Sequence, residues 1–376
     1  MPKLRFSSFK GEWKKTELKD ILKVNSGKDY KHLNQGEIPV YGTGGYMLSV
    51  DKPLSKEDAV GIGRKGSIDK PQRLKAPFWT VDTLFYCTPK NDSDLHFLFT
   101  LFNTINWKMY DESTGVPSLS KATIEKIGHY VPCNREQKKI GKFFELIDLK
   151  IQRQQEKVDA WREYKKGMVQ KIFSRELRFK DEDGQEFPEW EYTNLSEYSS
   201  VQGGFAFKST LFKKIGIPIV RISNIIDTNS SSDNYVYYPE DIAIDSKFIV
   251  RKNDLLIAMS GATTGKTGVY GNDFPSYLNQ RVGLFKGNSN LYYPYLIPLV
   301  ESHIFKNELK TLLVAGAQPN ISPTDIQSIN LPFPCLSEQR KIGDFIYVID
   351  QKIMKEESKV VYLQEQKQGF MQQMFI

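Results

Sequence analysis

The chain contains a long internal repeat, and this feature constrains its fold more than any other. The segment VPCNREQKKIGKFFELIDLKI, which begins at Val131, matches FPCLSEQRKIGDFIYVIDQKI, which begins at Phe333, without a gap and 202 positions later. A second match joins LRFSSFKGEW from Leu4 to LRFKDEDGQEFPEW from Leu177, 173 positions later. A repeat of this length indicates that the chain builds one structural unit twice.

The two separations add up to 375, one less than the chain length of 376. The end of the second unit is therefore followed in register by the start of the first, as in a cyclic sequence that is cut once. This pattern predicts a pseudo-twofold arrangement of two equivalent units, with the two ends of the chain close together.

Each unit ends in a segment with helical periodicity. After Pro132, apolar residues recur at helical spacing, and between Ile147 and Ile172 the steps alternate between four and three residues. The matching segment after Pro334 has the same seam. Such spacing is typical of a coiled coil, and a twofold relation makes the two helices antiparallel. About forty residues at 1.5 Å per residue give a rod of roughly 60 Å.

Polar residues interrupt both seams at equivalent positions. Gln154 matches Glu356, and Lys165 matches Lys367. Polar residues in a coiled-coil core commonly fix register and partner at some cost in stability.

The remaining segments contain short apolar runs separated by glycine-rich loops. IPVYG, FWTVDTLFYC, IPIVRISNI, DLLIAMS and RVGLF predict strands, and LHFLFTLF and YPYLIPLV predict short helices. The predicted fold class is α+β, with two globular mixed α/β domains separated by two long antiparallel helices that form a coiled coil. The predicted domains are 1–131 and 181–332, and the predicted helical spacers are 132–180 and 333–376. The mixed segments differ while the helical segments stay alike, so we expect the two domains to recognise different things.

Composition and charge exclude several classes of protein. With 40% hydrophobic and 26% charged residues and no long apolar run, the sequence predicts an ordinary soluble, cytoplasmic protein without a signal peptide. Its three cysteines and four histidines show no disulfide framework or metal-ligand spacing. A net charge of +7 permits a polyanionic partner.

Two glycine-rich segments imitate nucleotide-binding motifs. A Walker loop that ends in Gly265, Lys266 and Thr267 requires glycine at position 260, where the chain has Ser260. In AVGIGRKGSIDK the glycines spell G-x-G-x-x-G, but Pro71 follows and leaves no helix to receive a pyrophosphate. Neither segment predicts a nucleotide site.

The segments GGFAFKS, GIPIVRISNI, DLLIAMSGATTGKTGVY, LNQRVGLF, GAQPNIS and LPFPCLSEQRKIGDFIYVID, with a weaker second copy in the first unit, resemble the specificity subunit of type I restriction-modification systems. The resemblance extends over essentially the whole chain. It implies two target-recognition domains that each read one half of a bipartite DNA site. The long helices would set the distance between the half-sites and dock two modification (methyltransferase) subunits. The GATTGKT segment would then be a backbone-exposing loop, with Lys70 opposite Lys266.

The same resemblance places catalysis in other chains. No Asn-Pro-Pro-aromatic motif of adenine methyltransferases and no nuclease cluster is found in the sequence. We therefore expect a subunit that is not an enzyme and holds no cofactor. S-adenosylmethionine, ATP and Mg are expected on the modification and restriction subunits that would be its partners.

Candidate DNA contacts are basic and polar residues in the loops of the recognition segments. Phosphate contacts supply affinity, and Arg, Asn, Gln and Ser read base edges. The basic candidates are Lys28, Lys31, Arg64, Lys65, Lys70, Arg73, Lys75, Lys208, Lys213, Lys214, Arg221, Lys266 and Arg281. The candidate readers are Ser223, Asn224, Asn279, Gln280, Gln318 and Asn320, with Ser118 in place of Asn320 in the first unit. Any one of these side chains could instead cap a turn or face solvent.

One alternative function and the role of one basic segment stay open. The chain could be a non-catalytic adaptor in which a coiled coil holds two protein-binding domains. In addition, the segment from Asn134 to Lys180 has 14 Lys and Arg against 7 Asp and Glu. This excess could face acidic partner surfaces, the DNA between the half-sites, or solvent.

Overall fold

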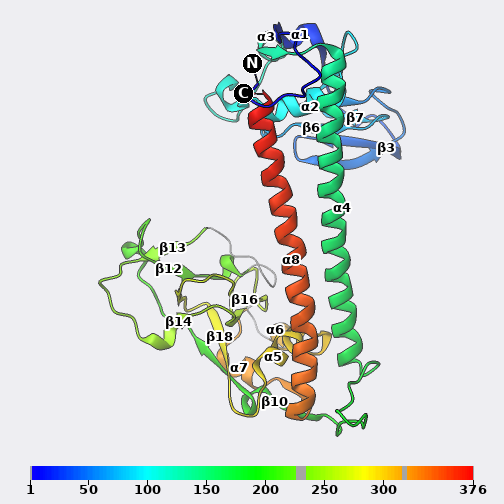
Figure 1. Ribbon diagram of the computed structural model, residues 1–376. Helices are drawn as coiled ribbons and strands as arrows, with labels where there is room; N and C mark the ends of the chain where they lie inside the picture. The colour runs from blue at the N-terminus through cyan, green and yellow to red at the C-terminus, as the bar shows by residue number, and fades with distance from the viewer. Residues whose placement is uncertain (1, 226–233, 316–319, 376) are drawn as a thin grey trace. The chain divides into compact units, whose positions relative to one another are not determined.

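The computed structural model describes residues 2–225, 234–315 and 320–375 (Figure 1). The chain divides into two compact units. The first unit covers residues up to Glu156 together with those from Ser358 onward, and the second covers Lys157–Glu357. Each unit therefore combines one globular head with part of each long helix, α4 (Asn134–Phe173) and α8 (Leu336–Phe375). The division into heads and separate helical spacers at the boundaries given above stays a prediction.

The first head is built from three sheets and short helices. The sheets have the orders β2-β8-β5-β6, β4-β3-β7 and β1-β9. The strands are β1 (Lys14–Glu17), β2 (Leu22–Ser26), β3 (Gln35–Gly42), β4 (Gly45–Val50), β5 (Ala59–Gly63), β6 (Gln72–Leu74), β7 (Trp79–Thr80), β8 (Leu84–Pro89) and β9 (Gly128–Val131). The helices are α1 (Leu18–Ile21), α2 (Leu95–Thr104), the 3-10 helix η1 (Trp107–Tyr110) and α3 (Lys121–Lys126).

The second head repeats this plan with additions. Its sheets have the orders β11-β18-β15-β16, β13-β12-β17-β14 and β10-β19. The strands are β10 (Glu191–Asn194), β11 (Ser199–Gly203), β12 (Ile217–Val220), β13 (Val236–Tyr238), β14 (Ile249–Val250), β15 (Leu255–Ala258), β16 (Thr267–Val269), β17 (Ser276–Leu278), β18 (Val282–Gly287) and β19 (Asn330–Phe333). The helices are α5 (Tyr293–Glu301), α6 (His303–Ala315), α7 (Pro323–Gln327) and the 3-10 helices η2 (Leu195–Glu197), η3 (Ser209–Leu211), η4 (Ile222–Asn224) and η5 (Ser246–Phe248).

The register of the strands shows that the heads are equivalent. In the first head β3 runs parallel to β7, with Val40 opposite Trp79. In the second head β12 runs parallel to β17, with Ile219 opposite Tyr277. The other ladders between these strands are antiparallel. Apart from β14–β17, which has no counterpart among the described strands of the first head, they join corresponding strands in both heads. The predicted internal repeat and the predicted α+β class are confirmed.

The long helices contribute to the core of each head. In the first unit, Phe144 of α4 and Phe375 of α8 lie in one hydrophobic core with Phe97 of α2. In the second unit, Phe173 at the end of α4 packs on Tyr295 of α5, which is fully buried. Burying a large apolar side chain contributes about 1.5–3 kcal/mol. The helix ends are therefore part of the folded heads.

Within each unit the helix segments are antiparallel, as predicted. In the first unit, Phe143 near the start of α4 packs on Phe370 near the end of α8, with ring centroids 5.2 Å apart. In the second unit, the ammonium of Lys165 near the end of α4 lies 2.8 Å from the carboxylate of Asp350 on α8. The predicted closeness of the chain ends is also confirmed, because the Leu4 N–H donates to the carbonyl of Gln373 at 2.9 Å.

One expected strand is interrupted. The run FWTVDTLFYC forms β7 and β8, which belong to different sheets. Between them the Leu84 N–H donates to the carbonyl of Val81 at 3.0 Å and closes a turn. Similarly, the end of IPIVRISNI forms the 3-10 helix η4. Both interruptions place polar residues on exposed turns.

Candidate nucleic-acid interface

In each head, backbone hydrogen bonds hold several turns together at one edge of the two larger sheets. We call these turns the loop edge. In the second head it comprises residues 204–205, 221–224, 259–266, 279–281 and 320–321. The bonds that join them are Phe205 N to Leu278 O (2.8 Å), Asn279 N to Val220 O (3.1 Å), Met259 N to Arg281 O (2.8 Å) and Ile321 N to Met259 O (2.9 Å).

The first head has the same bonds at matching positions. They are Lys28 N to Thr80 O (2.9 Å), Val81 N to Tyr41 O (3.0 Å), Arg64 N to Thr83 O (2.7 Å) and Leu119 N to Arg64 O (2.9 Å). The loop edge of the first head therefore comprises residues 27–28, 42–44, 64–70, 81–83 and 118–119. A shared backbone frame thus presents different side chains in the two heads. The matched positions are Gly42 and Arg221, Arg64 and Met259, Asp82 and Gln280, Thr83 and Arg281, and Ser118 and Asn320.

The strand register also tests the predicted equivalence of Lys70 and Lys266. Gly61 lies opposite Gln72, and the equivalent Leu256 lies opposite Gly268. Lys70 lies two positions before Gln72, and Lys266 lies two positions before Gly268. The predicted equivalence of the two lysines is therefore confirmed. The GATTGKT segment is the turn from β15 into β16, and no helix follows it. It is a loop of the second head and lacks the helix N-terminus that a phosphate-binding loop requires.

The basic candidates of the first head divide into two groups. Arg73 contacts the His96 ring at 3.4 Å, Lys75 pairs with Asp58 at 2.9 Å, and the Arg64 guanidinium lies over the Phe85 ring at 5.8 Å. The other lysines are exposed and have no ion pair within the described residues. They are Lys28, Lys31, Lys65 and Lys70.

In the second head most candidates are also exposed. The Arg281 side chain extends from a turn whose shape is fixed by Asn279, because the Asn279 side chain accepts a hydrogen bond from the Arg281 N–H at 3.1 Å. The residues whose side chains are exposed are Lys208, Lys213, Lys214, Ser223, Gln280, Arg281 and Asn320, whereas Lys266 and Asn279 are half-buried and Ser118 of the first head is half-buried too. Gln318 lies outside the described residues.

Asn224 differs from the other candidate readers because it is buried. Its side-chain oxygen accepts a hydrogen bond from the Arg221 N–H at 2.9 Å, and its amide donates to the carbonyl of Asn234 at 3.3 Å. Arg221 is half-buried and donates to the same carbonyl at 3.3 Å. Asn224 thus shapes the turn that exposes Ser223. The DNA-binding roles of all these candidates remain predictions.

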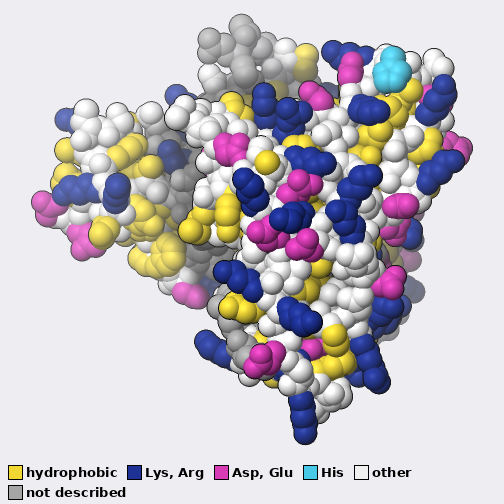
Figure 2. Space-filling model, turned by 90° about the horizontal axis from the view of Figure 1, so that it is seen from above, with side chains coloured by type: hydrophobic (Ala, Val, Ile, Leu, Met, Phe, Trp, Pro, Cys, Tyr) yellow, Lys and Arg dark blue, Asp and Glu magenta, His cyan; other side chains and the backbone are white. Residues whose placement is uncertain are grey.

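Charge alone does not outline the interface. Figure 2 shows Lys and Arg side chains spread over the visible face with Asp and Glu among them. The loop edge is therefore defined by its backbone geometry, and the basic residues are assigned to it by position.

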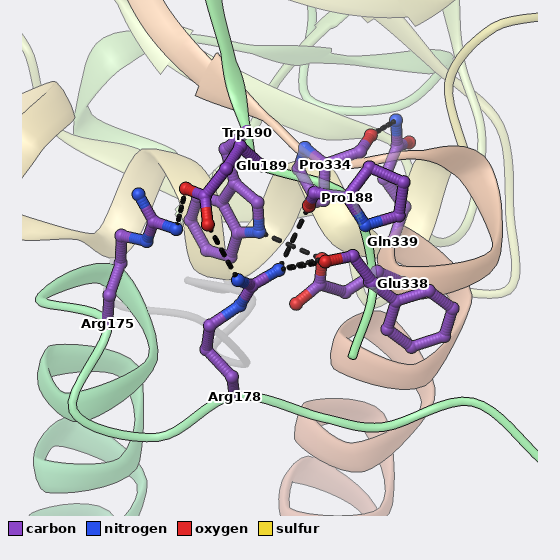
Figure 3. A network of polar contacts seen from close by, with 9 residues as sticks. Arg175, Arg178, Pro188, Glu189, Trp190, Pro334, Glu338 and Gln339 are labelled. Atoms are coloured by element: carbon purple, nitrogen blue, oxygen red, sulfur yellow. Dashed lines mark hydrogen bonds and ion pairs between the residues drawn. The ribbon is translucent and has the colours of Figure 1, made fainter. Parts of the chain in front are cut away.

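Away from the loop edge, each head is tied to a long helix by an Arg-Glu-Trp cluster, which we call the clasp. In the second unit, Glu338 in the first turn of α8 is fully buried and accepts a hydrogen bond from the Trp190 indole N–H at 2.9 Å (Figure 3). The Arg178 guanidinium lies 3.5 Å from the same carboxylate. Arg178 also binds Glu189 at 3.2 Å and the carbonyls of Phe187 and Pro188, both at 2.9 Å.

The first unit has the equivalent clasp. Arg5 donates to both oxygens of the buried Glu136, each at 2.7 Å, and the Trp13 indole lies 3.4 Å from the carboxylate. The hydrogen bonds to Glu136 raise the pKa of Arg5. The LRF and EW segments of the repeat therefore fold back onto the start of a long helix in both units.

The amino-acid sequence also matches a known protein family. Residues 10–159 and 188–362 match the model of the type I restriction modification DNA specificity domain. The chain belongs to this family.

Curated proteins similar to this chain include specificity subunits of type I restriction enzymes. It is 30% identical to the type I restriction enzyme MjaVIII specificity subunit of Methanocaldococcus jannaschii over 257 residues, 65% of this chain and 60% of that protein. It is 29% identical to the EcoAI specificity subunit of Escherichia coli over 42% of this chain and 28% of that protein. The matches thus span less than two thirds of the length of these curated relatives.

Solved structures share the fold over nearly the whole chain. The S subunit of a type I restriction-modification system from M. genitalium has a TM-score of 0.63 at 15% identity, covering 100% of this chain and 99% of that one. A chain from a structure described as the basis of complex assembly and conformational transition of the type I R-M system has a TM-score of 0.53 at 15% identity, with 96% of both chains covered. At these identities the likeness concerns the fold.

Both repeated segments, VPCNREQ and FPCLSEQ, contain a Glu-Gln pair whose contacts the sequence alone does not reveal. Gln137 accepts a hydrogen bond from the Asp94 N–H at 3.2 Å, and Gln339 accepts one from the Tyr292 N–H at 2.9 Å. Asp94 and Tyr292 are the N-cap residues of α2 and α5. Each glutamine thus joins a long helix to the start of a short helix in the head. The recurrence of this glutamine at the start of both long helices was the one sequence feature that pointed to these contacts.

The two lysines that interrupt the seams form ion pairs with neighbouring carboxylates. Lys165 lies 2.8 Å from both Glu301 and Asp350, and Lys367 lies 2.6 Å from Asp148. Burial lowers the pKa of Lys165, but the two carboxylates outweigh it and the pKa is raised. Burial raises the pKa of Asp350 despite the nearby ammonium. The raised pKa keeps Lys165 charged at neutral pH, and a charged residue in a coiled-coil seam favours one register of the two helices.

Neither a metal centre nor a membrane segment is found in the described part of the chain. Residues 2–225, 234–315 and 320–375 hold no group of three or more His, Cys, Asp or Glu side chains arranged to bind a metal ion. None of the described helices combines the length and hydropathy needed to cross a bilayer.

Proposed function

We propose that this chain is the DNA sequence-specificity subunit of a type I restriction-modification complex, in which each head reads one half of a bipartite target. The observation that carries the proposal is the loop edge. One backbone frame occurs twice, and most of its matched positions carry different side chains. In a member of the specificity-domain family, this is the arrangement expected of two heads that bind DNA alike and read different sequences.

The chain itself supplies no catalysis in this proposal. The modification subunits transfer the methyl group from S-adenosylmethionine, and restriction subunits use ATP and Mg, all in the cytoplasm. The long helices space the half-sites and dock two modification subunits. Exposed apolar side chains on α8 in the second unit, Tyr347 and Val348, support docking, since exposed apolar groups mark contact surfaces.

DNA binding through the loop edge is tested with Lys70 and Lys266. Changing either residue to alanine in the complex assembled with modification subunits should weaken binding to all sequences similarly and reduce the salt-dependence slope by about one. Lys252→Ala is the matched control, because this lysine pairs with Asp273 and lies at the end of β15 opposite the loop edge. A salt-independent affinity of the parent complex would favour the alternative of an adaptor with protein-binding heads.

The spacing role is tested by shortening both helices. Removing seven residues around Gln154 and seven around Glu356 keeps both seams in phase and shortens each helix by roughly 10 Å. The preferred spacer should shrink by up to about three base pairs, measured across a library of spacer lengths. An unchanged preference in a complex that still binds DNA would show that the helices do not measure distance.

A further inference from the structure

The β3–β4 hairpin of the first head ends in a free two-stranded ribbon. β7 pairs with β3 at Val40 and Tyr41, and Gly42, which follows them, has its ladder partner Gly45 across the hairpin. Thr43 and Gly44 form the connection, and Gly45 has a φ of 107°, a conformation that glycine adopts without strain. A narrow tip therefore projects beyond the sheet.

Both faces of this tip carry exposed large side chains. Tyr46 is 63% exposed and Met47 is 50% exposed. Met47 is the extra residue of a bulge, where the register shifts after Val40, so contacts place the two side chains. Tyr46 packs on Tyr41, whereas Met47 lies at the Cβ position of Gly42, the next residue of β3, which faces the opposite side. Half or more of each side chain stays exposed despite its contacts within the head, and exposed apolar groups mark a contact surface.

The two side chains are held in place by their neighbours. The Tyr46 ring packs edge-on against Tyr41, with centroids 6.4 Å apart, and its hydroxyl lies 3.1 Å from that of Ser49. Met47 lies across Gly42, where a Cβ would approach its sulfur to 2.8 Å. The tip is therefore arranged before any partner binds, which lowers the entropy cost of binding.

The position of the tip identifies its partner. The Gln72 amide donates to the carbonyls of Gly42 and Thr43, both at 3.0 Å, and fixes the ribbon beside the turn of residues 64–70. This turn carries the exposed Arg64, Lys65 and Lys70. An apolar tip beside cationic side chains complements a nucleic-acid duplex, which offers base edges between two rows of phosphates.

We propose that the β3–β4 ribbon enters the major groove of the first head's half-site, where Tyr46 and Met47 read bases by apolar contact. This rests on the proposed function. A two-stranded ribbon fits the major groove, about 12 Å wide, and the thymine 5-methyl group is the apolar feature there. In the second head the position of Gly42 is taken by Arg221, which leads into η4. The contact therefore belongs to one half-site.

The test uses the full chain assembled with modification subunits. Tyr46→Ala and Met47→Ala should relax one or two base pairs of one half-site in the methylated motif and lower affinity for the parent target roughly tenfold. Replacing thymine by deoxyuridine in that half-site should weaken the parent complex and leave the variants unchanged. Tyr130→Ala is the matched control, because Tyr130 lies in the same head on β9 and is 58% exposed.

Other outcomes would overturn the proposal. If both variants keep the parent motif and affinity, the ribbon does not read DNA, and the proposed function stands. If they lose assembly with modification subunits while the motif is unchanged, the ribbon docks a protein. If the parent complex shows no sequence preference, the proposed function fails and this inference fails with it. Thermal unfolding of the variants confirms that the head is intact.

Discussion

The two units anchor their heads with the same residues but support them unequally. In the first clasp, Arg5 places both of its hydrogen bonds to a side chain on Glu136. In the second, Arg178 shares its donors among Glu338, Glu189 and two backbone carbonyls. The lysine pairs show the reverse order, because Lys165 of the second unit holds two carboxylates and Lys367 of the first holds one. A repeated geometry can thus rest on different local energetics.

The largest expected effect comes from the lysine pairs. Lys165→Met removes the charge from a side chain that is 8% exposed and leaves the partly buried Glu301 and Asp350 without their common cation. Breaking a buried pair in this way costs about 3–5 kcal/mol. Lys367→Met is the matched variant, and it should cost roughly 1 kcal/mol because Asp148 is 30% exposed. Urea unfolding of both variants measures the difference, and equal losses would contradict it.

The clasps should differ in the opposite direction. Glu136→Ala leaves Arg5 with a single carbonyl partner, that of Gly11, and should cost about 2–3 kcal/mol. Glu338→Ala should cost less, since Arg178 keeps Glu189 and its backbone acceptors. Hydrogen exchange localises each loss to its own unit. A larger loss in the second unit would show that the Trp190 contact dominates the clasp.

Replacing glycines on the two long helices by alanine should change stability in opposite directions. An alanine Cβ at Gly343 would lie 2.9 Å from the Tyr295 backbone nitrogen, so Gly343→Ala should destabilise the second unit by about 1–3 kcal/mol. A Cβ at Gly167 meets nothing within 4 Å, so Gly167→Ala on α4 should stabilise the protein by about 0.5–1 kcal/mol. Thermal unfolding distinguishes them. If both changes destabilise the protein, the loss at Gly343 cannot be attributed to the close approach of α5 to α8.

The smallest effect is a dependence on pH. The pKa of Lys165 is raised in the folded state, so its contribution is complete below the unfolded pKa, about 10.4, and is lost as pH rises through the folded value. The parent should therefore lose stability at alkaline pH more steeply than Lys165→Met does. Unfolding curves between neutral and alkaline pH, compared for the two proteins, measure this slope. Parallel curves would contradict the raised pKa.

Much of the fold could be predicted because the information is periodic or repeated. The apolar seam and the prolines placed the long helices within two or three residues of their observed starts at Asn134 and Leu336. The equivalence of Lys70 and Lys266 followed from alignment of the repeat. Such features depend on local spacing, which one sequence contains.

Features that depend on distant partners could not be predicted. Nothing local distinguishes Glu136 from a solvated helix glutamate, because its partner Arg5 lies 131 residues away. The burial of Asn224 follows from a turn closed by Arg221 and Asn234. Likewise, Tyr46 has the sequence pattern of an ordinary strand residue, and only the short pairing with β7 leaves its hairpin exposed.

The central claim is that each head reads its own half-site through the loop edge. The most direct measurement replaces residues 181–332 by the matching segment of a relative and determines the methylated motif of the assembled complex by methylation-sensitive sequencing. The account predicts that one half of the bipartite motif changes and the other half is retained. A motif in which both halves change would show that the two heads form a single reading surface, and would contradict the account.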